Sequence, residues 1–260
     1  MFKILKYSFY DLMRSRWTYV YFLFYLCLGF VLLFLNTDVS KAIITLLNII
    51  MILTPLIGTV FGIMYYYNAK EFTELLLAQP IKRRTIFMGQ YLGVAVSLSL
   101  SLVLGLGVPF LAYGLLKSGA IWNFATLLLI GALLTFIFTA LSINIGLSNN
   151  NKIKGFGYAI LLWLFMAVIY DGIFLITLVY FNEYPLDKLA LGLTAFNPID
   201  LSRILILLKL DISALLGYTG AVFQKFFGTS NGMLISFSLM VVWIALPLWR
   251  LVRKSQRKDF

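Results

Sequence analysis

The sequence contains no histidine and only one cysteine, Cys27, and both shortages limit the chemistry that the chain can perform. One thiol cannot form a disulfide within the chain, and the eight methionines are scattered without a close pair. Soft metals such as copper are normally held by clustered thiolate, thioether or imidazole ligands. We therefore expect no metal site and no cofactor. A Ser–His nucleophilic pair is excluded as well.

The phosphate-binding pattern Gly-x-x-x-x-Gly-Lys-Ser/Thr is also missing, so any ATP hydrolysis would have to come from another subunit. We do not expect this chain to be an enzyme. Charged residues are scarce, at 12% of 260 residues, whereas 62% of the residues are hydrophobic. This balance gives more apolar surface than a soluble core can bury, which indicates a polytopic membrane protein.

Six apolar runs are long enough to cross a membrane, because a helix needs about 18 to 20 residues to span the hydrocarbon core. The runs are residues 17–35, 43–67, 86–116, 121–147, 156–181 and 233–251. They are continuous rather than alternating, which favours helices over barrel strands. The predicted fold is all-α, with six transmembrane helices in one membrane domain that covers residues 1–260.

Basic residues outnumber acidic ones by 21 to 10, and their distribution predicts the orientation in the membrane. If the N-terminus lies inside, 15 of the 21 lysines and arginines fall in cytoplasmic segments, as the positive-inside rule requires. We expect both termini to be cytoplasmic. The formal charge of +11 then reflects basic ends that face anionic lipid, with no nucleic-acid partner.

The first residues of the chain predict an amphipathic helix that lies on the cytoplasmic leaflet before the first span. The apolar residues that recur at helical spacing are Phe2, Leu5, Phe9 and Leu12. Lys3 and Lys6 lie on the opposite face of this helix.

Residues 65–84 form a short charged interruption between the second and third apolar runs. Asn68 and Glu71 have the spacing of a capping box, which predicts a helix that begins at about Ala69. Pro80 should end it near Ala78. The apolar residues on one face are Phe72, Leu75 and Leu76, and the acidic residues toward the other face are Glu71 and Glu74. Such a helix can dock in a groove of a partner protein.

Two pairs of glycines have the spacing that lets helix backbones approach closely. They are Gly58 with Gly62 and Gly89 with Gly93. We expect them to pack helices within the chain, and homodimerisation is the alternative.

Asp171 is the single acidic residue deep within an apolar run. A charge there costs at least about 2.5 to 3.5 kcal/mol, so the side chain should face the interior of the bundle. Since no lysine or arginine lies in the core of any run, we expect hydrogen bonds rather than an ion pair, with Ser101 and Thr135 as partners. A polar clamp between helices is favoured. The alternative is the proton site of a secondary transporter, although the inverted repeats typical of that class are not visible.

The sequence Asn197-Pro198-Ile199-Asp200 predicts the start of a helix, with Asn197 as the cap and Pro198 in the first position. The following run, 201–210, is too short to span and should lie at the outer interface. Residues 217–228 are aromatic and weakly charged, which suits a membrane surface or a protein partner.

Several of these stretches resemble the permeases of type-2 ABC transporters. They are residues 11–17, the acidic helix followed by Gln79-Pro80-Ile81, and Gly89-Gln90-Tyr91. In that family the helix between spans two and three is the coupling helix that contacts a separate ATPase. The resemblance implies an ATPase contact at Glu71, Phe72, Glu74, Leu75 and Leu76.

A narrower resemblance, to the permeases of the nitrous oxide reductase maturation system, is carried by Asp171, the residues 197–203 and the residues 217–222. In that family the permease is a homodimer in the bacterial inner membrane, and a periplasmic copper-handling protein sits on its outer helices. The resemblance implies an outer partner contact at Asn197, Asp200, Arg203, Tyr218 and Phe223. The chain would then pass ATP-driven motion to a substrate or to that outer partner.

Overall fold

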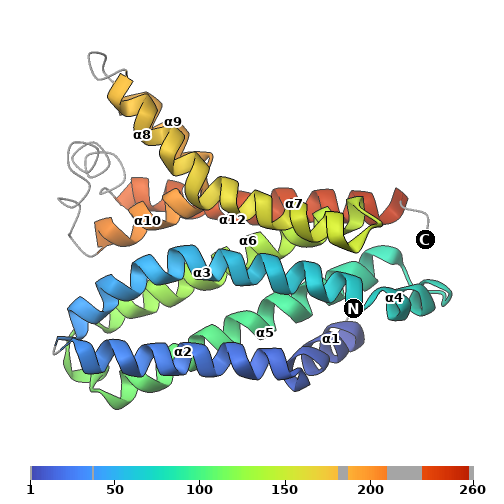
Figure 1. The fold of residues 1–260 in the computed structure, drawn as a ribbon, viewed down its shortest axis with the longest axis horizontal. Helices are drawn as coiled ribbons and strands as arrows, with labels where there is room; N and C mark the ends of the chain where they lie inside the picture. Colours follow the sequence, from blue (N-terminus) through green and yellow to red (C-terminus); the bar gives the residue numbers. More distant parts are fainter. Residues whose placement is uncertain (1, 37, 181–186, 210–229, 258–260) are drawn as a thin grey trace. The chain divides into compact units, whose positions relative to one another are not determined.

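A computed structural model describes residues 2–36, 38–180, 187–209 and 230–257 of the chain. Every regular element in these ranges is helical, so the predicted all-α class is confirmed (Figure 1). The α-helices are α1 (Phe2–Arg14), α2 (Arg16–Leu35), α3 (Val39–Asn68), α4 (Lys70–Leu77), α5 (Arg83–Ala112), α6 (Ile121–Ser148), α7 (Lys152–Leu164), α8 (Tyr170–Tyr180), α9 (Asp187–Ala195), α10 (Pro198–Lys209) and α12 (Ser230–Arg257). A 3-10 turn, η1 (Leu115–Lys117), follows α5, and a π-helical turn, η2 (Phe165–Ile169), joins α7 to α8.

Within the described residues, six helical segments are long and apolar enough to cross a membrane, as the sequence predicts. They are Arg16–Leu35, Val39–Asn68, Arg83–Ala112, Ile121–Ser148, Lys152–Thr177 and Gly232–Gln256. The fifth segment runs through α7, η2 and most of α8, so the π-helical turn interrupts a membrane span rather than a loop.

The chain divides into two compact units, one of Met1–Ile160 with Ile244–Phe260 and one of Leu161–Trp243. In the first unit α5 packs against α1, α2 and α6, and α3 packs along α6 (Figure 1). In the second unit α9 contacts α8 and α10. That all 260 residues act as one permease domain stays a prediction.

Both glycine pairs are used for packing within the chain. A Cβ atom on Gly62 would overlap the Ser142 hydroxyl of α6 and lie 3.3 Å from the Thr139 backbone, so glycine lets α3 and α6 approach this closely. A Cβ atom on Gly93 would lie 2.6 Å from the Cβ atom of Ser8 on α1. The expectation of intrachain packing is therefore confirmed for these pairs.

The N-terminal amphipathic helix is present as α1, but its buried face differs from the predicted one. The residues buried on α1 are Ile4, Ser8 and Leu12, whereas Leu5 and Phe9 are only half-buried. The physical reason is the glycine pair of α5, which brings the α1 backbone close at Ile4 and Ser8. One face of α1 therefore packs on the membrane span α5. Its amphipathic sequence also suits a lipid surface.

A cluster of buried hydrophobic side chains lies at the end of the first unit that carries α4. Its buried members are Tyr66, Phe87, Tyr91, Ala95, Ala140, Ile143, Leu147 and Leu251. Asn144 adds a polar link, because its amide group donates to the carbonyl oxygen of Pro247 on α12 at 2.7 Å. The end of α3 next to α4 is therefore fixed by packing from α5, α6 and α12.

Candidate functional site

The helix predicted over about Ala69 to Ala78 is present as α4, Lys70–Leu77, but the predicted capping box is wrong. Asn68 is the last residue of α3, and Ala69 is the N-cap of α4, without a side-chain capping bond. The Asn68 side-chain oxygen instead accepts a hydrogen bond of 3.3 Å from Lys152 Nζ. Because α3 stays helical through Asn68, this residue cannot adopt the extended backbone that a cap needs.

A buried polar contact anchors α4 to the bundle. Gln90 Nε2 on α5 donates to the hydroxyl oxygen of Thr73 at 2.8 Å, and that hydroxyl donates to the Ala69 carbonyl at 2.7 Å. Both side chains are buried. The contact orients α4 with Thr73 inward, so the residues on the other faces of α4 point away from α5. Sequence reasoning missed this anchor because a lone Thr–Gln pair 17 residues apart has no local signal.

The predicted ATPase-contact residues of α4 are brought onto one short helix, but they are not equally accessible. Leu75 is 68% exposed, and Glu71 and Glu74 are exposed as well. Phe72 is half-buried, because its ring stacks on Tyr7 of α1 with a centroid distance of 4.5 Å. Glu74 lies 3.7 Å from Lys70 in an exposed ion pair, which contributes little to stability. Leu75 is therefore the most exposed apolar group on α4.

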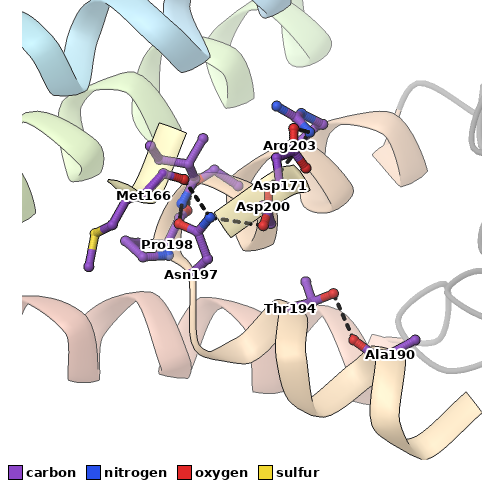
Figure 2. A network of polar contacts seen from close by, with 10 residues as sticks. Met166, Asp171, Ala190, Thr194, Asn197, Pro198, Asp200 and Arg203 are labelled. Atoms are coloured by element: carbon purple, nitrogen blue, oxygen red, sulfur yellow. Dashed lines mark hydrogen bonds and ion pairs between the residues drawn. The ribbon is translucent and has the colours of Figure 1, made fainter. Parts of the chain in front are cut away.

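The second cluster of polar residues lies in the second unit and is centred on Asp171. Arg203 Nη1 of α10 donates to Asp171 Oδ2 at 2.9 Å, and it lies 3.6 Å from Asp200 Oδ1 (Figure 2). The expectation that Asp171 forms no ion pair is therefore wrong. The predicted partners, Ser101 and Thr135, instead donate to carbonyl oxygens of their own helices. The partner was missed because Arg203 comes from a short helix outside the spans.

Asn197 confirms the predicted start of α10 and also reaches into the fifth span. Its side-chain oxygen accepts from the Ile199 amide at 3.1 Å, which is the predicted cap. Its amide group donates to the carbonyl oxygen of Met166 at 2.8 Å and to Asp200 Oδ2 at 2.9 Å (Figure 2). Met166 belongs to the π-helical turn η2. Asn197 therefore ties the π-helical turn to α10.

The turn between α9 and α10 is held by side chains from both neighbouring spans. Tyr170 of α8 donates to the Leu193 carbonyl at 2.6 Å, and Trp243 of α12 donates to the Ala195 carbonyl at 3.0 Å. These bonds satisfy the last carbonyl groups of α9, which have no partner within their own helix. Phe196, next in the turn, is 72% exposed. The second unit thus presents one large apolar side chain on a firmly held turn.

Burial, and to a lesser extent the nearby Asp171 carboxylate, raises the pKa of Asp200 from its ordinary 3.8 to about 6. Arg203 and the hydrogen bond from Asn197 act in the opposite direction. Two carboxylates therefore share one guanidinium group in a partly buried site.

Not all of the residues predicted to contact an outer partner are exposed. Asn197 and Asp200 are buried and bonded within the chain, and Arg203 is half-buried. Tyr218 and Phe223 lie outside the described residues. Within the part of the chain that the structure describes, no three His, Cys, Asp or Glu residues are grouped so that they could hold a metal ion.

The fold defines a multi-pass membrane protein that carries a short exposed helix between its second and third spans. Two curated proteins that are similar to the chain over most of its length are both named probable ABC transporter permease protein NosY. The protein from Stutzerimonas stutzeri is 24% identical over 92% of this chain and 89% of its own length. The protein from Pseudomonas aeruginosa is 26% identical over 82% of this chain and 76% of its own length. No protein-family model matches the chain.

These similarities confirm the resemblance that the sequence motifs suggested. They support the assignment of the chain as a permease subunit of an ABC transporter. A permease of this kind implies a separate ATPase partner. The alternative of a proton-driven transporter depends on Asp171. Its carboxylate forms an ion pair with Arg203 at 2.9 Å, so any proton site there would include both residues.

Proposed function

We propose that the chain is the membrane subunit of an ABC transporter and that α4 is the helix by which a separate ATPase moves it. The observation that carries the proposal is the geometry of α4, a short helix anchored by Gln90 and Thr73 that leaves Leu75, Glu71 and Glu74 exposed. This anchor connects α4 to α5, so a movement of α4 would be passed to α5. The similarity to proteins named as ABC permeases supports the same role.

The finer proposal is that the chain works in the maturation of the copper enzyme nitrous oxide reductase, in the bacterial inner membrane with both termini in the cytoplasm. The name NosY of the relatives and the motif at Asn197, Asp200 and Arg203 support it. We further propose that the permease acts as a homodimer with two ATPase copies. A strain that lacks this gene should accumulate nitrous oxide reductase without its copper.

We also propose that a periplasmic copper-handling protein contacts the outer helices. Asn197, Asp200 and Arg203 are bonded within the chain, so their role in this proposal is to hold the α9–α10 turn rather than to touch the partner. The exposed group on that turn is Phe196. Motion of the fifth span would reach the partner through the bond between Met166 and Asn197.

The decisive experiment co-expresses the chain with the ATPase encoded beside its gene and measures co-purification and ATPase activity. Leu75→Ala should weaken the complex about tenfold, because an exposed apolar anchor is worth about 1.4 kcal/mol when it is buried by a partner. Glu71→Lys with Glu74→Lys should impair coupling while the membrane fold stays intact, since both acids are exposed. Phe72→Ala is a weaker probe, because it also removes the stacking on Tyr7.

Leu116→Ala provides the matched control, because Leu116 is also a leucine with 68% exposure and it lies in η1, at the opposite end of α5 from α4. This variant should bind the ATPase like the wild type. If the Leu75 and acid variants bind as well as the Leu116 variant does, α4 is not the coupling helix and the ABC proposal loses its main physical support.

A further inference from the structure

A pocket of about 450 Å³ lies in the first unit, where the end of α1 meets the end of α3 and the start of α4. Its buried lining consists of Leu12 and Tyr65, with Met64 half-buried beside them. Asp11 and Arg14 are exposed lining residues. The pocket therefore combines an apolar interior with one acidic and one basic group near solvent.

The two charged groups are placed as a pair with opposite signs. Asp11 and Arg14 are three residues apart on α1, so they lie on the same side of the helix with Cβ atoms about 5 to 6 Å apart. None of the ion pairs found among the described residues involves either side chain. Both charges are thus available to one ligand that carries a positive and a negative group a similar distance apart.

Aromatic groups complete the lining. The rings of Tyr7 and Phe72 stack at 4.5 Å, and Tyr7 is 50% exposed. An exposed ring face beside Asp11 attracts an ammonium group, because the ring and the carboxylate both favour positive charge. Tyr65 lines the pocket beside these rings, and its hydroxyl oxygen is buried.

The position of the pocket along the chain indicates the part of the membrane that it faces. Exposed Trp17 and Tyr19 lie at the start of the first span, and exposed Tyr10 lies on α1. Tryptophan and tyrosine are enriched at the headgroup level of membranes. The charged pocket residues, Asp11 and Arg14, fall between these aromatic residues in the sequence, so the pocket opens at headgroup level rather than in the hydrocarbon.

We propose that this pocket binds the headgroup of a phospholipid that carries a phosphate and a primary ammonium group, as phosphatidylethanolamine does. Arg14 holds the phosphate. Asp11 and the exposed face of Tyr7 hold the ammonium group. Leu12 and Met64 contact the apolar part of the lipid. A lipid with an anionic headgroup and no ammonium would place negative charge beside Asp11, so the site discriminates between headgroups. The site shares Phe72 with the proposed ATPase contact, whereas Asp11 and Arg14 lie on α1, outside that contact.

The test uses the full-length chain, purified without an ATPase and placed in lipid nanodiscs of phosphatidylethanolamine, phosphatidylglycerol or phosphatidylcholine. Native mass spectrometry measures retained lipid, and thermal unfolding measures stabilisation. The wild type should retain phosphatidylethanolamine preferentially. Asp11→Asn and Arg14→Gln should each reduce this retention about tenfold, since each removes one charge-assisted contact. Lys3→Gln on α1 and Glu71→Gln on α4 are matched controls, because both residues are exposed and lie outside the pocket lining.

The lipid preference is measured on the wild-type protein alone, so this part of the test does not depend on whether a variant folds. Equal retention of the three lipids by the wild type would overturn the proposal. Equal losses in the control variants would also overturn it, because they would mean that overall charge decides lipid binding. If Asp11→Asn and Arg14→Gln retain lipid like the wild type but no longer co-purify with the ATPase, the pocket belongs to that protein partner instead.

Discussion

The guanidinium group of Arg203 lies 2.9 Å from the carboxylate of Asp171, although the two residues are 32 positions apart in the chain (Figure 2). The same guanidinium group lies 3.6 Å from Asp200. One cation therefore serves two acids, and removal of the cation is not equivalent to removal of one acid. The site is only partly exposed, with 26% of the Arg203 side chain and 32% of the Asp171 side chain accessible.

We expect Arg203→Gln to destabilise the protein more than Asp171→Asn. The first variant leaves two neighbouring carboxylates without a cation and should cost about 2 kcal/mol, because an unpaired, partly buried charge is expensive. The second variant leaves the pair between Arg203 and Asp200 and should cost less than about 1 kcal/mol. Thermal unfolding in detergent measures the difference.

The double variant Arg203→Gln with Asp200→Asn is the control for this interpretation. It removes the cation together with one of its two acids, so it should recover part of the stability that Arg203→Gln loses. If Asp171→Asn proves as costly as Arg203→Gln, the carboxylate of Asp171 contributes more to stability than its pair with Arg203, and this interpretation of the network is wrong. Loss of activity in Asp171→Asn at normal expression would instead favour the proton-transporter alternative.

The raised pKa of Asp200 predicts a specific dependence of stability on pH. The folded protein holds this proton up to about pH 6, whereas the unfolded chain releases it near pH 3.8. Folding therefore takes up a proton between these values, and the free energy of unfolding rises as the pH falls from about 6 to about 4. The gain is at most about 3 kcal/mol, since each pKa unit corresponds to about 1.4 kcal/mol.

Asp200→Asn separates this effect from that of the other acids. The difference in stability between the wild type and this variant should change between about pH 4 and pH 6 and stay constant above about pH 7. A difference that is flat over the whole range would contradict the raised pKa of Asp200.

The spans were predictable because the length of an apolar run is a local property of the sequence. The predicted first span, 17–35, is observed as Arg16–Leu35, and the predicted fourth, 121–147, as Ile121–Ser148. The start of α10 was predictable for the same reason, since Asn197 and Pro198 are adjacent and their backbone preferences act locally.

The errors arose where a residue's partner is distant in sequence. Asn68 has the spacing of a cap but bonds to Lys152, and Asp171 bonds to Arg203 rather than to a neighbour within the bundle. The sequence places Phe72 on the apolar side of α4, but no local pattern indicates that Tyr7 stacks on its ring. Capping and helix periodicity describe single elements, whereas these contacts depend on how elements pack.

Gly93 provides a direct test of how α1 is packed. A Cβ atom there would lie 2.6 Å from the Cβ atom of Ser8 and 3.1 Å from the Phe9 amide nitrogen, so Gly93→Ala must displace α1. We expect a loss of about 1 to 3 kcal/mol in thermal unfolding. Gly107→Ala on the same helix is the control, because no atom lies within 4 Å of its Cβ position and alanine favours a helix. Equal effects of the two substitutions would contradict the packing of α1 on α5.

The predicted orientation in the membrane can be tested at two exposed sites that the structure makes comparable. In a Cys27→Ser background, Leu75→Cys places a thiol on α4, which the positive-inside rule assigns to the cytoplasm. Phe196→Cys places one on the α9–α10 turn, which the same rule assigns to the outside. The native side chains are 68% and 72% exposed, so a difference in labelling reports the side of the membrane rather than burial. A membrane-impermeant maleimide should label Phe196→Cys on intact cells and label Leu75→Cys only after permeabilisation. The reverse pattern would invert the topology, and it would place α4 where no ATPase could reach it.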